Sequence, residues 1–579
     1  MIPKIVRVSP LFFISWQILG ILHGIAYGVI APITQNFFDK ATAFASHRTV
    51  LSEVITGLIV LGLAQVVKQA LNGIVNFMVM IYYRKAEGVL SLEVHEKMSR
   101  LDPASFEDTQ ALDSINKAIQ GKNEAMWFTG SILATFNFYI PYFLCMAVYL
   151  FSIRPILVVS LTLVFTPTLF TQILRTKVFS KAEDQSAPIR REFDYYENCI
   201  VSREYFKETR ILGAFSFFRQ LYADSLILLN RLRFRASVKS DMAELGMQII
   251  SLCGYVGILL LLLQSLMNRQ IGVGAFAAIF GSVDQMFSLM KELICYNYGA
   301  VARDFGRVQN YLRFMEMPER DGANVDISDD ADIILRNVSF TYPGVDQKAV
   351  DSVNLKIKNG ETIAIVGENG SGKTTLVRLL IGIYLPTDGE VCHGGYNTKD
   401  ISMTGLFGRI SAVFQKYQRY QMNLRENIGI SQVNISADED TFDIICTQAG
   451  INKGDNSFPE GYDTMLSREF DGVDLSGGQW QRVAIARGYF RPHQVIVLDE
   501  PTAAIDPIEE TKIYNRFAEI SKERTAVIVT HRLGSVKLAD RILVMKNGRL
   551  VEQGTHDELI TIGGEYARLY TSQEQWYKS

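Results

Sequence analysis

The 579-residue sequence has no excess of charge of either sign, because 58 Lys and Arg side chains are balanced by 61 Asp and Glu side chains for a net charge of −3. Proteins that bind nucleic acids usually carry a basic excess, so this balance argues against nucleic acid as a partner. Charged residues make up only 21% of the chain and hydrophobic residues 48%, which excludes a disordered protein.

Paired cysteine spacings are also missing. The six cysteines stand far apart in the sequence, at Cys145, Cys199, Cys253, Cys295, Cys392 and Cys446. This distribution supports neither a disulfide framework nor a zinc site, and free, buried thiols are expected.

Long apolar runs are absent after about residue 300, whereas six runs before it approach or exceed the roughly 20 residues that cross a bilayer as a helix. The predicted spans are Leu11–Thr34, Val54–Tyr83, Ala125–Phe151, Pro155–Leu174, Met247–Met267 and Ile271–Tyr296. A secretory signal peptide is the alternative for the first run, but that run is over 20 residues long and contains Pro32. The fold class predicted is a six-helix membrane bundle followed by an α/β domain, and the mean hydropathy of +0.11 averages the two.

The positions of Lys and Arg predict which parts of the chain lie on the cytoplasmic side of the membrane. The two long connections, about 84–124 and 175–245, are rich in both, whereas the other loops hold only Lys40, Arg48, Arg154 and Arg269. Positive loops stay in the cytoplasm, so the N-terminus and the C-terminal half are predicted to be cytoplasmic and the chain to lie in the plasma or inner membrane. Both connections are expected to be helical extensions that turn near Pro103–Thr109 and Ser202–Phe215, since loops of this length without structure are uncommon.

A phosphate-binding loop is predicted at 367–374. The letters GENGSGKT fit the pattern G-x-x-x-x-G-K-[ST], follow an apolar strand at Ile363–Val366 and precede a helix predicted over 375–384. Glycines let backbone N–H groups surround phosphates closely, while Lys373 would reach the β- and γ-phosphates and Thr374 would bind Mg²⁺. The residues predicted to bind ATP here are Gly367, Asn369, Gly370, Ser371, Gly372, Lys373, Thr374 and Thr375.

Two carboxylates follow a second apolar strand at Val495–Leu498. Asp499 ends that strand and is predicted to hold Mg²⁺, and Glu500 is placed to polarise an attacking water. Lys373, Glu500 and Mg²⁺ together predict hydrolysis of ATP.

The letters LSGGQ at 475–479 stand between these two motifs, and the three together resemble the ABC transporters. The resemblance implies roles for single residues: Tyr342 stacks on adenine, Gln415 senses Mg²⁺ and the γ-phosphate, and His531 contacts the γ-phosphate. It also implies that Asp506 contacts a second cassette. Ser476, Gly477, Gly478 and Gln479 would complete the ATP site of another chain, so a dimer follows; a homodimer is the simplest reading and a heterodimer is compatible.

Six membrane helices followed by one cassette resemble an exporter-type half-transporter, of the peptide- or bacteriocin-exporting or siderophore-transporting subgroups. Two departures from the family pattern stand out. Asp471 and Asp474 precede the signature, which puts the contact with the second inner loop in doubt and leans toward peptide export. Ala503 stands where many members have Ser, which would weaken coupling between the two ATP sites.

The predicted domains are a transmembrane domain at 1–315, a linker at 316–330 and a nucleotide-binding domain at 331–579. The predicted function is ATP-driven export of a peptide, a drug or another amphipathic small molecule. Uptake of a metal chelate and a non-transporting regulatory ATPase are the alternatives. Intramembrane polar groups usually face a polar cavity, which makes them candidates for substrate binding. The candidates are His23, Asn72, Asn76, Asn137, Gln248 and Asp284.

Overall fold

The computed structural model describes residues 1–433, 438–500, 507–522, 524–530 and 535–578. The chain divides into two compact units. The first comprises residues 1–96 and 114–317, and the second comprises residues 97–113 and 318–579. The short segment 97–113, called here the α3–α4 turn, therefore groups with the C-terminal unit although the sequence places it between two membrane helices.

The first unit is entirely helical. Its elements are α1 (Ile2–Val8), α2 (Pro10–Ala45), α3 (Leu51–Arg100), α4 (Thr109–Ala134), the π-helix η2 (Thr135–Tyr139), α5 (Ile140–Ile153), α6 (Pro155–Val201), α7 (Phe206–Ile211), α8 (Phe215–Met267), α9 (Val273–Lys291), the π-helix η3 (Glu292–Tyr298) and α10 (Gly299–Met315). Within the described residues, six helical segments are long and apolar enough to cross a membrane. The predicted count of six is confirmed.

The predicted spans lie where the helices are, with small differences. The sixth helix begins at Val273, two residues after the expected start, because Gly272 is still extended. Helix α1 was not expected; it ends where Ser9 adopts an extended conformation, and Pro10 then occupies the first position of α2, where its missing N–H costs no hydrogen bond.

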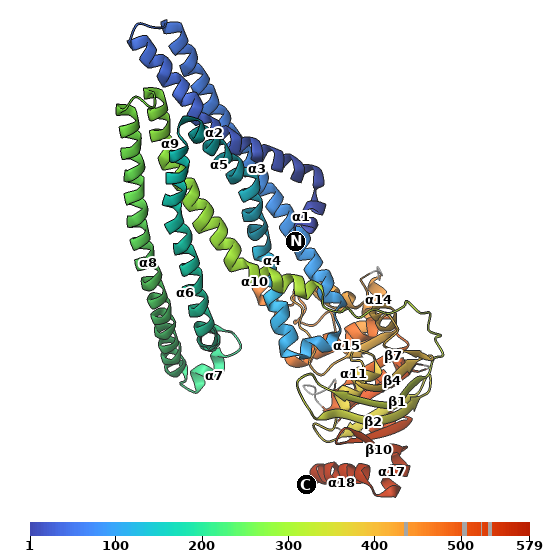
Figure 1. Ribbon diagram of the computed structural model, residues 1–579. Coiled ribbons are helices and arrows are strands. Elements are labelled where there is room, and N and C mark those ends of the chain that lie inside the picture. Colours follow the sequence, from blue (N-terminus) through green and yellow to red (C-terminus); the bar gives the residue numbers. More distant parts are fainter. Residues whose placement is uncertain (434–437, 501–506, 523, 531–534, 579) are drawn as a thin grey trace. The chain divides into compact units, whose positions relative to one another are not determined.

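Both long connections are helical extensions that end in short helices. The first turns through the 3₁₀ helix η1 (Pro103–Glu107), capped by the Asp102 carboxylate, which accepts a hydrogen bond of 3.0 Å from the Ala104 N–H. The second turns through α7. Helices α6 and α8 run side by side and α7 joins them (Figure 1).

The C-terminal unit is built on two sheets. An antiparallel sheet has the order β2-β1-β4-β5, and a six-stranded sheet has the order β10-β9-β3-β8-β7-β6. The strands are β1 (Ile333–Thr341), β2 (Lys348–Ile357), β3 (Thr362–Gly367), β4 (Asp388–His393), β5 (Tyr396–Asn397), β6 (Ile410–Val413), β7 (Val495–Asp499), β8 (Thr525–Val529), β9 (Arg541–Lys546) and β10 (Arg549–Gly554). Strands β9, β3, β8, β7 and β6 are parallel neighbours, and only β10 pairs antiparallel.

The α-helices of this unit are α11 (Lys373–Leu380), α12 (Met403–Phe407), α13 (Leu424–Gly429), α14 (Glu439–Ala449), α15 (Gly477–Phe490), α16 (Pro507–Ile520), α17 (His556–Ile562) and α18 (Glu565–Lys578). The helix expected over 375–384 ends early, at Leu380, because Gly382 adopts a left-handed conformation with φ of 69°. Side chains of β3, such as Ile363 and Val366, are fully buried, which is typical of a central strand covered on both faces.

The α3–α4 turn is held to the rest of the C-terminal unit by polar contacts. Lys97 Nζ lies 2.9 Å from a Glu319 carboxylate oxygen, and the Arg320 N–H donates to the Arg100 carbonyl at 2.9 Å. The Arg320 guanidinium donates a hydrogen bond of 2.7 Å to the Gly382 carbonyl, which lies just after α11. Glu319 and Arg320, which follow α10, therefore hold the α3–α4 turn against the C-terminal unit.

Candidate nucleotide-binding site and membrane cavities

The topology of the larger sheet brings the two predicted ATP motifs to one edge. The phosphate loop follows β3, Asp499 ends β7 and Glu500 comes directly after it, with β8 lying between these two parallel strands. Ligands of α/β proteins bind at the carboxyl ends of parallel strands, because loops and helix N-termini gather there. The motifs lie 125 residues apart in the chain and meet because the sheet is parallel.

The phosphate loop has the backbone shape that its glycines were expected to permit. Gly370 and Gly372 adopt φ values of 80° and 98°, which side chains other than glycine rarely tolerate. A Cβ on Gly372 would lie 2.4 Å from the Ala349 carbonyl oxygen, and one on Gly367 would lie 2.3 Å from the Met545 carbonyl oxygen. Backbone atoms of neighbouring segments therefore pack so closely against Gly367 and Gly372 that neither position can hold a side chain.

Lys373 is buried at the first position of α11, and its side chain folds back over the loop. The ammonium donates to the carbonyls of Gly367 and Glu368, both at 2.9 Å. Burial lowers the pKa of this ammonium, while the charges of Glu500 and Asp499 act in the opposite direction. The hydroxyl of Ser371 is also buried, and no partner reaches it within the described part of the chain. A positive charge and an unsatisfied hydroxyl inside a backbone cradle fit a phosphate group.

The predicted Mg²⁺ ligands lie together. The Thr374 hydroxyl donates to the Asp499 carboxylate at 3.4 Å, across the gap between the two motifs. Burial, followed by the neighbouring charge of Glu500, raises the pKa of Asp499 to about 6. A carboxylate that is costly to ionise beside a hydroxyl group suits a divalent cation, which would offset the buried charge. The site fits Mg²⁺ with Thr374, Asp499 and Gln415 as its candidate ligands.

Glu500 lies at the end of β7 in contact with Gln415. The Gln415 side-chain amide donates to the Glu500 carboxylate at 2.6 Å. Glu500 also has a φ of 48°, an unusual value for a residue other than glycine, and its N–H donates to the Val529 carbonyl at 3.0 Å. Non-glycine residues in this conformation are concentrated at functional sites, where the surrounding structure fixes the direction of the side chain.

Tyr342 follows β1 and contacts the start of α11 through its hydroxyl group. The Tyr342 and Thr375 hydroxyls lie 2.9 Å apart, and the Tyr342 ring packs edge-on against Phe340 and Tyr384. The aromatic residue predicted to stack on adenine is thus connected to the helix of the phosphate loop.

The signature residues begin α15. Ser476 and Gln479 form a capping box, in which the Gln479 N–H donates to the Ser476 hydroxyl at 3.3 Å and the Ser476 N–H donates to the Gln479 side chain at 2.9 Å. The exposed Ser476 leaves the N-terminus of a 14-residue helix, with Gly477 and Gly478 in its first turn, open to a ligand. The Gln479 amide donates to Ser457 rather than toward the phosphate loop.

Three sequence predictions fall outside the described residues: His531, Asp506 and Ala503.

Two of the six candidate substrate residues line a cavity. Gln248 and Asp284 face a cavity of about 420 Å³ between α6, α8 and α9. Asn137 is instead buried and donates to Gln17 at 3.1 Å, so it joins η2 to α2. His23 packs against Tyr27 and Phe138.

Asn72 and Asn76 lie one turn apart on α3, where the Asn76 amide donates to Asn72 at 3.1 Å. Like His23 and Asn137, they line neither this cavity nor the apolar cavity beside Phe143 and Met286.

The sequence predictions did not include two residues whose contacts the structure shows, Lys68 and Glu107. Lys68 is the only charged residue in the second predicted span, and its ammonium lies 4.9 Å from the centre of the Tyr27 ring; its isolation in an apolar run was an available signal. Glu107, in the α3–α4 turn, accepts hydrogen bonds from Tyr384 at 2.6 Å and from Arg378 at 3.3 Å. Its partners are more than 270 residues away, and no local pattern indicates them.

Comparisons with known proteins agree with this geometry. Residues 350–503 match the family described as ABC transporter. The chain is 39% identical over 246 residues to the subtilin transport ATP-binding protein SpaT of Bacillus subtilis, covering 42% of this chain and 39% of that protein. It is 33% identical over 332 residues to the ATP-dependent lipid A-core flippase of Photobacterium profundum, covering 56% and 55%. The chain thus spans roughly half the length of these relatives or less.

A solved structure extends the comparison of the fold to nearly the whole chain. A bacterial Atm1-family ABC exporter with ATP bound matches 96% of this chain and 98% of its own, with a TM-score of 0.79 and 20% identity. That likeness covers the membrane helices as well as the cassette. Residues 350–503 are therefore similar to the ABC transporter family, and the fold of the chain, with its six membrane-length helices, is similar to that of an ABC exporter.

Proposed function

We propose that this chain is one half of an ATP-driven membrane exporter and that two copies form the working transporter. The observation that carries the proposal is the meeting of Lys373, Thr374, Asp499 and Glu500 at one sheet edge in a chain with six membrane-length helices. Relatives named as a subtilin transport protein and a lipid A-core flippase support a transport function.

The chemistry proposed is in-line attack of water on the γ-phosphate of ATP. Positioning and charge stabilisation supply most of the catalysis in such reactions. Glu500 orients the water, and Gln415 holds the Glu500 carboxylate through the 2.6 Å hydrogen bond. Lys373 leaves its two loop carbonyls to reach the phosphates. Mg²⁺, when bound, would neutralise charge that develops on the phosphate oxygens.

A second copy is proposed because no hydrogen bond among the described residues joins the first turn of the signature helix to the phosphate loop of the same chain. The hydrogen bonds of Ser476 and Gln479 are local, and the open end of α15 is a ready anion site. We propose that ATP lies between the phosphate loop of one copy and the signature helix of another. A homodimer is the simplest assembly, since one chain supplies both halves.

Movement would pass from the cassette to the membrane helices through the α3–α4 turn. ATP can drive a conformational change because it binds the closed cassette pair better than the open one. The contact of Glu107 with Tyr384 and Arg378 supports this route, since Arg378 lies on the helix that begins with Lys373.

The excess of Lys and Arg in the two long connections supports a cytoplasmic cassette and N-terminus, in a plasma or inner membrane. The experiment that tests the function is transport into inside-out vesicles containing the full-length chain. ATP-dependent accumulation of a labelled amphipathic compound is expected for an exporter. ATP-dependent loss from preloaded inside-out vesicles would favour uptake, and ATP hydrolysis without any movement would favour a regulatory ATPase.

A further inference from the structure

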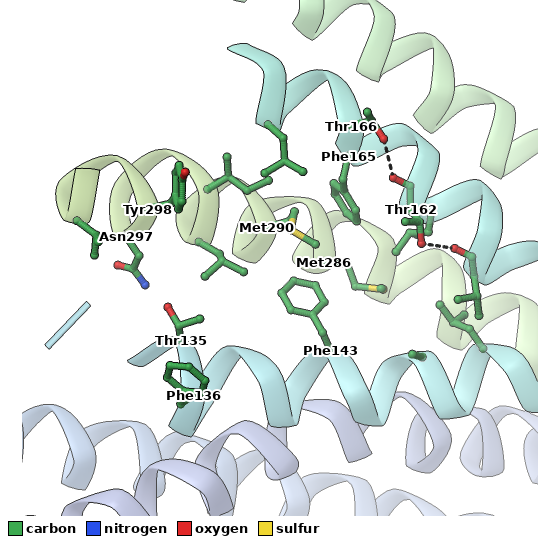
Figure 2. A pocket seen from close by; sticks show the side chains of 18 of the residues that line it. Thr135, Phe136, Phe143, Thr162, Phe165, Thr166, Met286, Met290, Asn297 and Tyr298 are labelled. Atoms are coloured by element: carbon green, nitrogen blue, oxygen red, sulfur yellow. Dashed lines mark hydrogen bonds between the residues drawn. The ribbon is translucent and has the colours of Figure 1, made fainter. Parts of the chain in front are cut away.

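Two cavities of the membrane unit differ in chemistry. The larger, about 590 Å³, lies between the α4–α5 segment, α6 and the α9–α10 segment, and Figure 2 shows the side chains around it. The smaller, about 420 Å³, lies between α6, α8 and α9. Phe165 lines both, and its ring packs against Phe287 of the smaller cavity.

The larger cavity is apolar. Phe143, Phe165, Met286 and Met290 surround its middle, while Thr135 and Asn297 lie toward one end (Figure 2). Methionine side chains are flexible and polarizable, so they adapt to different apolar shapes. A cavity of this size and lining suits the hydrocarbon or aromatic part of a small molecule.

The smaller cavity contains the charged groups. Glu244 and Gln248 come from neighbouring turns of α8, and Asp284 and Lys291 lie two turns apart on α9, roughly 10 Å along the helix. Asp284 lies 11 residues after the start of α9, roughly 16 Å along it and deep within the predicted span. A carboxylate at such a depth is costly unless it faces water or a counter-ion.

The two carboxylates of the smaller cavity differ in their partners. Glu244 lies 3.4 Å from Arg175 and accepts a hydrogen bond of 2.8 Å from Gln248, so its charge is already offset. Within the part of the chain that the structure describes, no hydrogen bond or ion pair reaches the Asp284 side chain. Asp284 is therefore the carboxylate that is open to a ligand.

Aromatic rings lie beside Asp284 in this cavity. Phe287 is one turn further along α9, and its ring centre lies 5.0 Å from that of Phe165 and 5.1 Å from that of Tyr255. The faces of aromatic rings attract cations, more strongly when water is excluded. A carboxylate beside three rings is an arrangement that favours an organic cation over an anion or a neutral polar group.

We propose that the smaller cavity binds an amphipathic organic cation, with its positive group at Asp284 among Phe165, Tyr255 and Phe287 and its apolar part against these rings and the neighbouring Met247 and Leu252. This inference rests on the proposed transport function and specifies the substrate class of that transporter. The charge of Lys291 opposes a cation in the same cavity, so the balance between Asp284 and Lys291 sets the preference for ligand charge.

The test measures binding of tetraphenylphosphonium, a cation whose charge does not change with pH, to the full-length chain in lipid nanodiscs without ATP. Tetraphenylborate has the same shape and a negative charge, and empty nanodiscs report partitioning into lipid. We expect saturable binding of the cation to the wild-type chain and much weaker binding of the anion. Asp284→Asn should weaken binding of the cation about tenfold, as expected for losing one partly desolvated charge contact.

The companion variants separate a charge effect from a folding defect. Lys291→Gln should strengthen binding of the cation several-fold, and Asp284→Glu should restore most of the wild-type affinity. Unchanged binding by Asp284→Asn, or equal binding of the cation and the anion by the wild-type chain, would overturn the proposal. ATPase activity of the same preparations is measured separately, so its loss would count against the transport function rather than against the cation site.

Discussion

The Glu107 carboxylate accepts a 2.6 Å hydrogen bond from the Tyr384 hydroxyl, which connects the α3–α4 turn to the segment that follows the helix of the phosphate loop. Arg378 joins both groups, since its guanidinium donates to Glu107 and to the Tyr384 hydroxyl. The Tyr384 ring stacks on Phe340 at 5.1 Å and meets Tyr342 edge-on. A contiguous set of contacts therefore runs from the predicted adenine-binding ring to the turn.

Tyr384→Phe removes the hydroxyl and keeps the ring, so it should separate ATP hydrolysis from transport. We expect basal ATPase activity within about threefold of wild type, because the two hydrogen bonds that are lost, to Glu107 and from Arg378, involve none of the groups predicted to bind phosphate or Mg²⁺. Stimulation of that activity by a transported compound should fall strongly. The measurement is ATPase activity in liposomes with and without the compound.

Glu107→Gln removes the charge of the other partner in this contact. Glu390→Gln is its matched control, because it makes the same change in the exposed Arg336–Glu390 ion pair on the antiparallel sheet. The control should behave as wild type. Full stimulation in both Tyr384→Phe and Glu107→Gln would show that this contact does not transmit the movement.

Glu500→Gln should abolish steady ATP turnover while ATP binding survives. The amide cannot polarise water as a carboxylate does, but the phosphate loop and Lys373 are untouched. We expect at least a 100-fold loss of turnover, in the range found when one catalytic group is removed. Steady-state phosphate release and equilibrium binding of a fluorescent ATP analogue measure the two properties. ATPase activity close to that of wild type would contradict the assigned role.

Acid should destabilise the cassette through His393. Burial lowers the pKa of this imidazole from its ordinary 6.5, and its Nε2–H donates to the Leu380 carbonyl at the end of α11 at 2.8 Å. Below about pH 6.5 the unfolded chain takes up a proton that the folded chain does not, so this stability is present above pH 6.5 and is lost as the pH falls toward the lowered pKa. The loss is at most about 1.4 kcal/mol per pH unit.

Thermal unfolding of the full-length chain between pH 7.5 and pH 5.5 measures this effect. His393→Gln should show a shallower dependence on pH than wild type, and the exposed His47→Gln should show the wild-type dependence. Equal slopes in wild type and His393→Gln would exclude the buried imidazole as the cause.

Local sequence patterns were sufficient to predict the membrane helices, the phosphate loop and the two turning points. Apolar run length indicates a span, and the glycines of 367–372 dictate a loop with positive φ angles. The turns at Pro103–Glu107 and Phe206–Ile211 interrupt long helical patterns and were found for that reason.

Contacts between distant residues could not be predicted in the same way. Asn137 and Asp284 look alike in sequence as polar residues of apolar runs, yet one pairs with Gln17 and the other faces a cavity. The difference depends on which face of each helix packs, and π-helical segments such as Thr135–Tyr139 shift that face by inserting a residue into the helical turn. The Glu107–Tyr384 contact likewise depends on tertiary packing alone.

The central claim is that ATP is hydrolysed in a site shared by two copies of this chain, and complementation tests it most directly. Lys373→Ala removes the phosphate-loop lysine and Ser476→Arg blocks the signature helix, so each variant alone should be inactive. In a heterodimer of the two, one site contains both changes and the other contains neither. Random mixing makes about half of the dimers heterodimers, so about a quarter of wild-type ATPase activity should return if the sites act independently. A mixture no more active than either variant alone would contradict the account.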